Sequence, residues 1–137
     1  MTLEAIAEEF ADVDDETRLE LLLDYAVRLP PLPPAYHALR DAGVNMIHEC
    51  QSPVFMTVEV TGGTVHLYAD VPREAPTPRS FVSILVRAFD GQPAHHVLEA
   101  PDDLLYRLGL THLLGMQRIH GLSAIYRHTL SEVARQL

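Results

Sequence analysis

Apolar side chains recur at helical spacing near the start of the chain. Leu3, Ile6 and Phe10 follow one another three or four positions apart, which predicts a first amphipathic helix. A second run with the same spacing predicts another helix with a buried stripe, formed by Leu19, Leu22, Leu23, Ala26 and Val27. The proline-rich run 29–34 ends this helix, because proline lacks a backbone donor and restricts the residue before it.

The pattern changes to alternation of apolar and other side chains in the middle of the chain. Alternating valines and a methionine over 54–60 predict a strand, and a second alternating run covers 65–69. Gly62-Gly63 between the two runs predicts a two-residue hairpin turn. A shorter third strand is expected over 44–48, so Cys50 would lie in a short link between strands.

Helical spacing returns after the strands. Thr77-Pro78 predicts the N-cap and first residue of a helix that stops at Gly91. Pro93 and Pro101 each suit the first turn of a short helix, and apolar positions over 119–137 predict a long last helix. The order predicts a single α+β domain over 1–137, with a small antiparallel sheet of about three strands and helices covering one face.

Charge limits the class of partner. The chain has 137 residues and a formal net charge of −9, which disfavours binding to nucleic acid or to an anionic membrane. The apolar runs are too short for a membrane span, and residues 1–4 do not resemble a signal peptide, so a cytoplasmic protein is expected. All ten basic residues are arginines. Without lysine the chain builds neither a pyridoxal phosphate Schiff base nor a Walker-type phosphate loop, and no cofactor is expected.

Cys50 is the single cysteine of the chain. One thiol excludes an internal disulfide and argues against zinc or iron–sulfur sites built on several thiolates. The eight histidines do not show the HExxH spacing, and no metal site is expected. Cys50 is the candidate nucleophile, although Glu49 would raise its pKa and only a protonated His48 would lower it. No set of residues supplies the base and oxyanion hole of a cysteine hydrolase.

Four short motifs occur in an order that resembles the SufE family. They lie at 30–33 (PPLP), 49–55 (ECQSPVF), 108–110 (LGL) and 118–122 (RIHGL). The corresponding family patterns are LPPLP, GCQSxVW, RLGL and SRxNGL, with similar separations. The resemblance extends from the second expected helix to the last.

The resemblance implies a fold similar to that of IscU-type iron–sulfur scaffold proteins, without the cluster-binding cysteines. It implies that Cys50 accepts persulfide sulfur from a PLP-dependent cysteine desulfurase similar to SufS, and thereby stimulates that enzyme. The sulfur would pass to a SufBCD-type scaffold for iron–sulfur cluster assembly. The protein would be an accessory and not an enzyme in its own right. In this family the acceptor cysteine typically rests in an apolar cavity and turns outward when the partner docks.

Further residues carry over from the family patterns. Arg118 matches the family arginine near the acceptor loop and is expected to orient the loop or the docked desulfurase. Asp70 matches an aspartate near that loop, which suggests a role in loop dynamics. The other residues expected to bind the partner or orient the loop are the neighbours of the cysteine, namely His48, Glu49, Gln51 and Ser52.

The chain departs from the family patterns at three positions. Glu49 replaces glycine and adds a charge at the expected docking surface, Phe55 stands where tryptophan is usual, and His120 replaces asparagine. These differences leave open which desulfurase is the partner and which protein receives the sulfur. Three alternatives also stay open: an iron–sulfur scaffold of the same fold, a thiol-dependent sulfurtransferase that acts alone, and an interaction module with an inert thiol.

Overall fold

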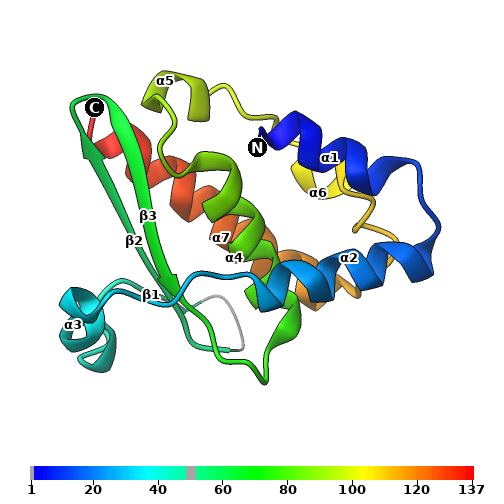
Figure 1. Ribbon diagram of the computed structural model, residues 1–137, viewed down its shortest axis with the longest axis horizontal. Helices are drawn as coiled ribbons and strands as arrows, with labels where there is room; N and C mark the ends of the chain where they lie inside the picture. The colour runs from blue at the N-terminus through cyan, green and yellow to red at the C-terminus, as the bar shows by residue number, and fades with distance from the viewer. Residues whose placement is uncertain (1, 49–51) are drawn as a thin grey trace.

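The computed structural model describes residues 2–48 and 52–137, which form an α+β fold as predicted (Figure 1). The chain begins with α1 (Leu3–Ala11), α2 (Asp15–Val27), the short 3₁₀ helix η1 (Pro34–Tyr36) and α3 (His37–Asp41). The strands are β1 (Met46–Ile47), β2 (Val54–Thr61) and β3 (Thr64–Asp70). They are followed by α4 (Pro76–Phe89), α5 (Ala94–Val97), α6 (Leu104–Arg107) and α7 (Met116–Arg135).

The three strands form one antiparallel sheet in the order β1-β2-β3. Gly62 and Gly63 make the hairpin turn between β2 and β3, with φ of +59° and +78°, which a residue with a side chain adopts at a cost. The register pairs Thr61 with Thr64 at the turn and Phe55 with Asp70 at the far end. The expected third strand is confirmed but contains only two residues, since the chain before it turns through Asn45 at a φ of 59°.

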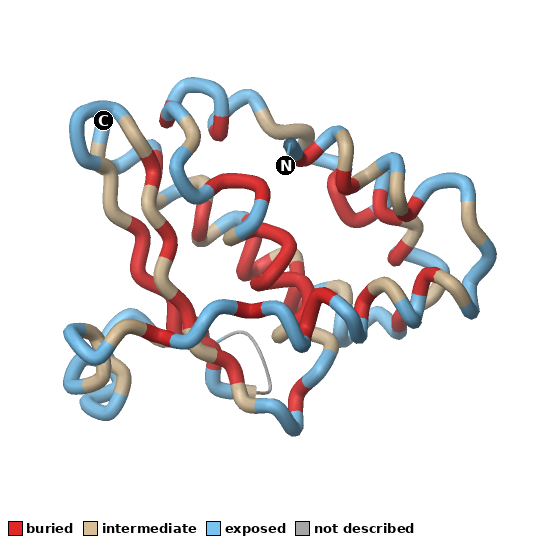
Figure 2. The backbone as a smooth tube through the Cα atoms, in the orientation of Figure 1, coloured by how far each residue is buried: buried red, intermediate tan, exposed pale blue. Residues whose placement is uncertain are grey.

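One face of the sheet packs against α4 and α7, and the core lies between these layers (Figures 1 and 2). Val58 and Leu67 are paired across β2 and β3, and both point into this core. From the helical side, Phe81 and Ile84 of α4 and Ile125 of α7 are fully buried. Burial of such side chains supplies most of the driving force for folding.

The other face of the sheet is partly covered by the segment that contains η1 and α3. The ring of Tyr36 stacks on that of Tyr68 with centroids 4.5 Å apart, and its hydroxyl donates to Glu59 at 2.8 Å. Arg40 of α3 forms an ion pair with Asp70 at 3.0 Å. The sheet is therefore covered on both sides near β1, beyond the single helical layer that the sequence predicted.

Side chains bond the open sides of the two long strands, which are β3 at one edge of the sheet and β2 beyond the two-residue β1. On β2, the backbone amide of Val60 donates to Gln136 Oε1 at 3.0 Å, and Gln136 Nε2 donates to the carbonyl of Val58 at 2.7 Å. On β3, the amide of Leu67 donates to Asp90 Oδ1 at 3.0 Å. The glutamine and aspartate thus bond backbone groups that a further strand would otherwise pair.

The turn between α1 and α2 is held by the buried side chain of Arg18. Its guanidinium donates to the carbonyl of Phe10 through Nε (3.0 Å) and Nη2 (2.8 Å), and to the carbonyl of Val13 at 2.9 Å. Asp15 pairs with the same group at 2.6 Å. The guanidinium lies directly over Gly109, where a built Cβ would be 2.5 Å from Nε.

The buried face of α2 differs from the stripe that the sequence predicted. Leu22 and Ala26 are buried as expected, whereas Leu19, Leu23 and Val27 are exposed. Their places in the core are taken by Arg18 and Tyr25, each of which has a hydrogen-bond partner for its polar end. A pattern that counts only apolar residue types does not detect such amphipathic side chains.

The start of α4 also differs from the prediction, because Thr77 is not its N-cap. The helix begins at Pro76, and Ala75 is the N-cap. Proline suits the first helical position, where no intrahelical hydrogen bond is needed, and it keeps the preceding residue out of the helical region. Short helices follow Pro93 and Pro101, beginning at Ala94 and Leu104, but neither proline lies in a first turn as predicted: Pro93 is the N-cap of α5, and Pro101 precedes the N-cap of α6 by two residues.

Candidate functional site

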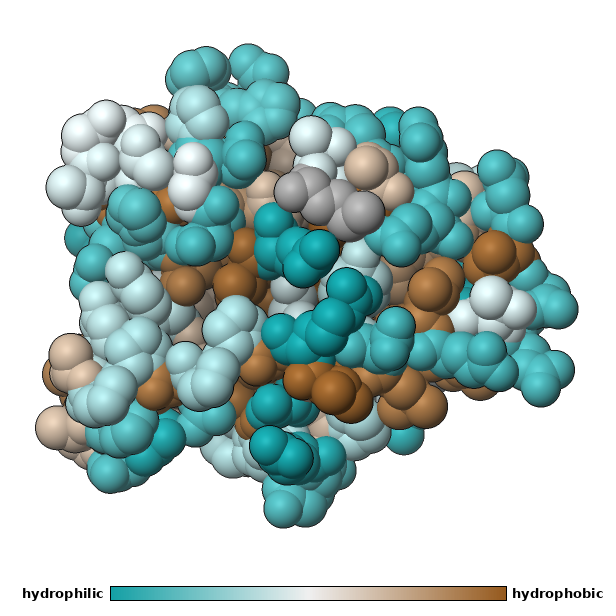
Figure 3. All heavy atoms as spheres, viewed as in Figure 1, coloured by the Kyte–Doolittle hydropathy of each residue, from teal (hydrophilic) through white to brown (hydrophobic). Residues whose placement is uncertain are grey.

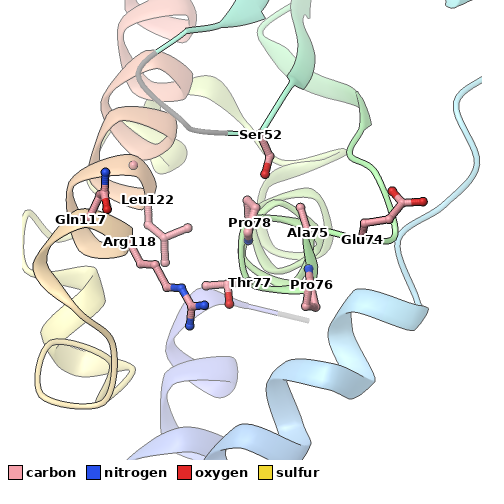
Figure 4. Close-up of a pocket in the computed structure, with 10 residues that line it drawn as sticks. Ser52, Glu74, Ala75, Pro76, Thr77, Pro78, Gln117, Arg118 and Leu122 are labelled. Atoms are coloured by element: carbon pink, nitrogen blue, oxygen red, sulfur yellow. The ribbon is translucent and has the colours of Figure 1, made fainter.

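A cavity of about 200 Å³ lies where the starts of α4 and α7 meet the segment that enters β2 (Figure 4). Ser52, which precedes β2, lines one side. The buried side chains of Ala75 and Leu122 give the cavity apolar walls. The remaining lining residues come from the two helix starts, namely Glu74, Pro76, Thr77, Pro78, Gln117, Arg118 and Gly121.

The wall formed by the start of α4 is held in place by Arg79. Its Nε donates to the carbonyl of Ala26 at 2.8 Å, and its Nη1 donates to the carbonyl of Val71 at 2.6 Å. One guanidinium therefore joins the end of α2, the chain that leaves β3 and the first turn of α4. Hydrogen bonds from a charged donor are stronger than neutral ones, so this contact makes the cavity wall rigid.

Side chains of both charge signs line the cavity, Arg118 from α7 and Glu74 from the segment before α4. Arg118 is an exposed residue in the first turn of α7, and its side chain extends toward Thr77 at the start of α4 (Figure 4). The N-termini of two helices of 14 and 20 residues border the same space. Each carries a partial positive charge from its unpaired backbone amides. Arg118 and the two helix N-termini would favour an anionic group such as a thiolate, whereas the Glu74 carboxylate would oppose it.

The structure brings together two of the residues predicted from the sequence, Ser52 and Arg118, which line the same cavity. His48 is exposed in the turn after β1. Asp70 ends β3 and pairs with Arg40, and it does not line the cavity. The other predicted site residues, Glu49, Cys50 and Gln51, lie outside the described residues.

Several wall residues of the cavity were missed by sequence reasoning. Thr77 and Pro78 carried only a signal for a helix start, and nothing in their types indicated a site. Gln117 and Leu122 adjoin or belong to the motif of Arg118, which is the signal that would have found them. Of the departures from the family patterns, Phe55 is fully buried in β2, as an aromatic residue on a buried strand face should be, and His120 is exposed.

Metal binding and membrane insertion are two other functions on which the described residues bear. Within residues 2–48 and 52–137, no group of three or more histidine, cysteine, aspartate or glutamate side chains is placed to hold a metal ion. No helix in this part of the chain has the length and apolar character needed to cross a membrane.

Comparisons with known proteins agree on one family. A family model described as "SufE: Fe-S metabolism associated domain" matches residues 4–133. Two SufE-like proteins of Mycobacterium tuberculosis, from strains CDC 1551 and H37Rv, are each 38% identical over 136 residues, covering 98% of this chain and 90% of theirs. The solution structure of a hypothetical protein from Thermus thermophilus superposes with a TM-score of 0.82 at 33% identity, covering 99% of this chain and 98% of that one.

Proposed function

The chain belongs to the SufE family, whose domain is associated with Fe–S metabolism, and on this premise we propose that Cys50 accepts sulfur from a cysteine desulfurase. The donor is the persulfide of a PLP-dependent, SufS-like enzyme, and removal of that persulfide stimulates its turnover. The sulfur then passes to a SufBCD-type scaffold. In this proposal the protein is an accessory in the cytoplasm and needs no cofactor of its own.

The proposed step is an exchange between a thiolate and a persulfide. The Cys50 thiolate attacks the outer sulfur of the desulfurase persulfide, and a new S–S bond forms on Cys50. The original S–S bond breaks, and the desulfurase cysteine leaves as a thiolate. One sulfur atom changes carrier without any net oxidation or reduction, so a single cysteine on each partner is sufficient.

The observation that carries the proposal is the position of the cavity relative to the acceptor motif. Ser52 lines the cavity, and Cys50 precedes it by two residues, which span at most about 7 Å of chain. A thiol that reaches the cavity meets Arg118 and two helix N-termini, which favour the thiolate form, and also Glu74, which disfavours it. The apolar walls formed by Ala75 and Leu122 would exclude water from a persulfide.

The roles predicted for the other site residues are supported to different extents by their positions in the structure. Arg118 lies where it could orient the acceptor segment or a docked desulfurase, and Ser52 lies at the mouth of the same space. Asp70 is joined to α3 through Arg40 and is paired with Phe55 near the start of β2, and its role in loop dynamics stays a prediction. The roles of His48, Glu49 and Gln51 stay predictions.

Intact-mass measurement under non-reducing conditions tests the proposal. The protein is incubated with a SufS-type desulfurase and cysteine, and Cys50→Ser is treated in parallel. We expect the mass of one or more sulfur atoms to be added to the parent protein and none to the variant. Sulfur on both proteins, or on neither while the desulfurase is active, would contradict the proposal. Loading by thiosulfate without a desulfurase would instead favour a sulfurtransferase that acts alone.

A further inference from the structure

Three large apolar side chains form an exposed ridge along one side of α2. Leu19, Leu23 and Val27 are 45%, 56% and 81% exposed and follow one another at intervals of four residues. Single exposed apolar residues are ordinary on a protein surface, but three in line over two turns make a continuous ridge about 12 Å long. Ridges with this spacing pack into the grooves of a second helix. In the space-filling view, hydrophobic surface emerges between hydrophilic side chains in the region of α2 (Figure 3).

An acidic row runs beside this ridge. Glu16, Glu20 and Asp24 are exposed and have the same four-residue spacing. On a helix each of them is the neighbour of a ridge residue three positions away. The exposed side of α2 therefore presents an apolar strip whose border is acidic from Glu16 to Asp24 and basic only at Arg28 after its last turn, on a protein that carries a formal net charge of −9.

The helix is fixed firmly to the rest of the protein. At its start, the amide of Thr17 donates to the N-cap side chain of Asp14 at 2.8 Å, and Arg18 anchors the preceding turn. At its end, Arg79 binds the carbonyl of Ala26. The opposite face, with Leu22, is buried against the core. The ridge is thus a preorganised surface, and a partner would not have to order it on binding.

We propose that the exposed side of α2 is a docking surface for a helix of another protein, one that carries an apolar stripe bordered by arginine or lysine. The apolar stripe would cover Leu19, Leu23 and Val27, and the basic border would pair with the acidic row. A second copy of this chain fits poorly, because pairing α2 with α2 brings two acidic rows together. The surface shares no residue with the cavity, so a partner can occupy it without closing the sulfur site.

Fluorescence anisotropy with a synthetic probe tests this surface. The probe is a labelled amphipathic peptide of about 20 residues, long enough to be helical, with a leucine stripe bordered by arginines. A second peptide has glutamates in place of the arginines. We expect the basic peptide to bind more weakly as salt is raised and the acidic peptide not to bind. The variant with Leu23→Ser and Val27→Ser should bind the basic peptide at least tenfold more weakly.

Matched variants separate the surface from general effects. Tyr106→Ser removes a large exposed side chain from a different helix, since Tyr106 of α6 is 70% exposed, and this variant should leave binding unchanged. Glu20→Gln should weaken binding of the basic peptide and reduce its salt dependence. Equal binding of both peptides, no binding of the basic one, or an effect of Tyr106→Ser as large as that of the α2 variant would overturn the proposal. So would a dimer, detected by sedimentation, that Leu23→Ser abolishes, because the surface would then belong to a second copy.

Discussion

Gly109 is a position where a single added methyl group should cost much stability. The residue has a φ of +72°, and a side chain in this left-handed region costs about 1–2 kcal/mol. The new Cβ would also lie 2.5 Å from Nε and 2.7 Å from Cζ of Arg18. The guanidinium cannot move away without losing its hydrogen bonds to the carbonyls of Phe10 and Val13, which are worth roughly 1.5–3 kcal/mol each. We expect Gly109→Ala to lower the free energy of unfolding by about 3–5 kcal/mol.

Gly91→Ala is the matched control. Gly91 has a φ of +81°, but a Cβ there would meet nothing within 4 Å. The control should therefore show only the backbone cost of about 1–2 kcal/mol. Urea unfolding followed by circular dichroism measures both variants, with the free energy extrapolated linearly to zero denaturant.

A double-mutant cycle tests whether Arg18 causes the difference in unfolding free energy between Gly109→Ala and Gly91→Ala. In an Arg18→Ala background the atoms that the new Cβ would meet are gone, and Gly109→Ala should cost no more than Gly91→Ala does in the parent. The reasoning is wrong if Gly109→Ala and Gly91→Ala cost the same in the parent protein. It is also wrong if the cost of Gly109→Ala is unchanged when Arg18 is replaced.

Three further predictions concern the cavity and the core. Arg118→Ala should slow sulfur loading of Cys50 roughly tenfold, which corresponds to about 1.4 kcal/mol. The control is Arg127→Ala, which replaces an exposed arginine on the same helix and should leave the rate unchanged. Equal rates for the two variants would contradict the role assigned to Arg118. Arg79→Ala should lower the free energy of unfolding by about 2–4 kcal/mol, because the carbonyls of Ala26 and Val71 lose a charged donor. The control is Arg87→Ala at an exposed position of α4, which should have a small effect. Equal urea midpoints for the two variants would argue against the contact. Burial, reinforced by the charges of Asp102 and Asp103, raises the pKa of Tyr126 to about 12. The contribution of Tyr126 to stability is therefore complete below pH 10 and is lost as the pH rises through 12. The urea midpoint of Tyr126→Phe should fall less than that of the parent over this range, and an identical fall would contradict the shifted pKa.

The hairpin was the element best predicted from the sequence. Alternation on both sides of Gly62-Gly63 marked the two strands and the turn between them. The burial of β3 follows that alternation, whereas the first five residues of β2 are all buried. The order of helices was predictable for the same reason, since their apolar spacing is regular. Helix starts were less certain: Ala75 has no cap side chain, and only the proline after it marks the boundary.

The buried face of α2 was not predictable from apolar spacing. Arg18 and Tyr25 enter the core because carbonyls and a carboxylate from α1 and the turn after it satisfy their polar ends. Those acceptors are five to sixteen residues away in sequence, beyond the reach of a helical pattern. Their packing leaves Leu19 and Leu23 outside, so the same tertiary contacts that defeated the prediction create the exposed ridge.

The candidate site was predictable only as far as the motifs reached. Ser52 and Arg118 are 66 positions apart in the chain and belong to two different motifs, and the order of the motifs alone did not show that the two residues share a cavity. The third side of that cavity, the start of α4, comes from a segment whose residue types carry no chemical signal. Its position depends on Arg79, whose two acceptors lie on different elements.

The occupied edges of the sheet determine how this protein can be recognised. Many binding domains capture an extended peptide as an extra strand, using backbone amides and carbonyls that read no sequence. Here Gln136 and Asp90 already bond to outward-facing backbone groups of β2 and β3. A peptide that added a strand along either stretch would have to displace these side chains before it gained the same hydrogen bonds. Such competition makes strand addition, by a partner or by another copy of the chain, less favourable there, and it favours recognition through side chains and helix surfaces, whose shape and charge discriminate between partners.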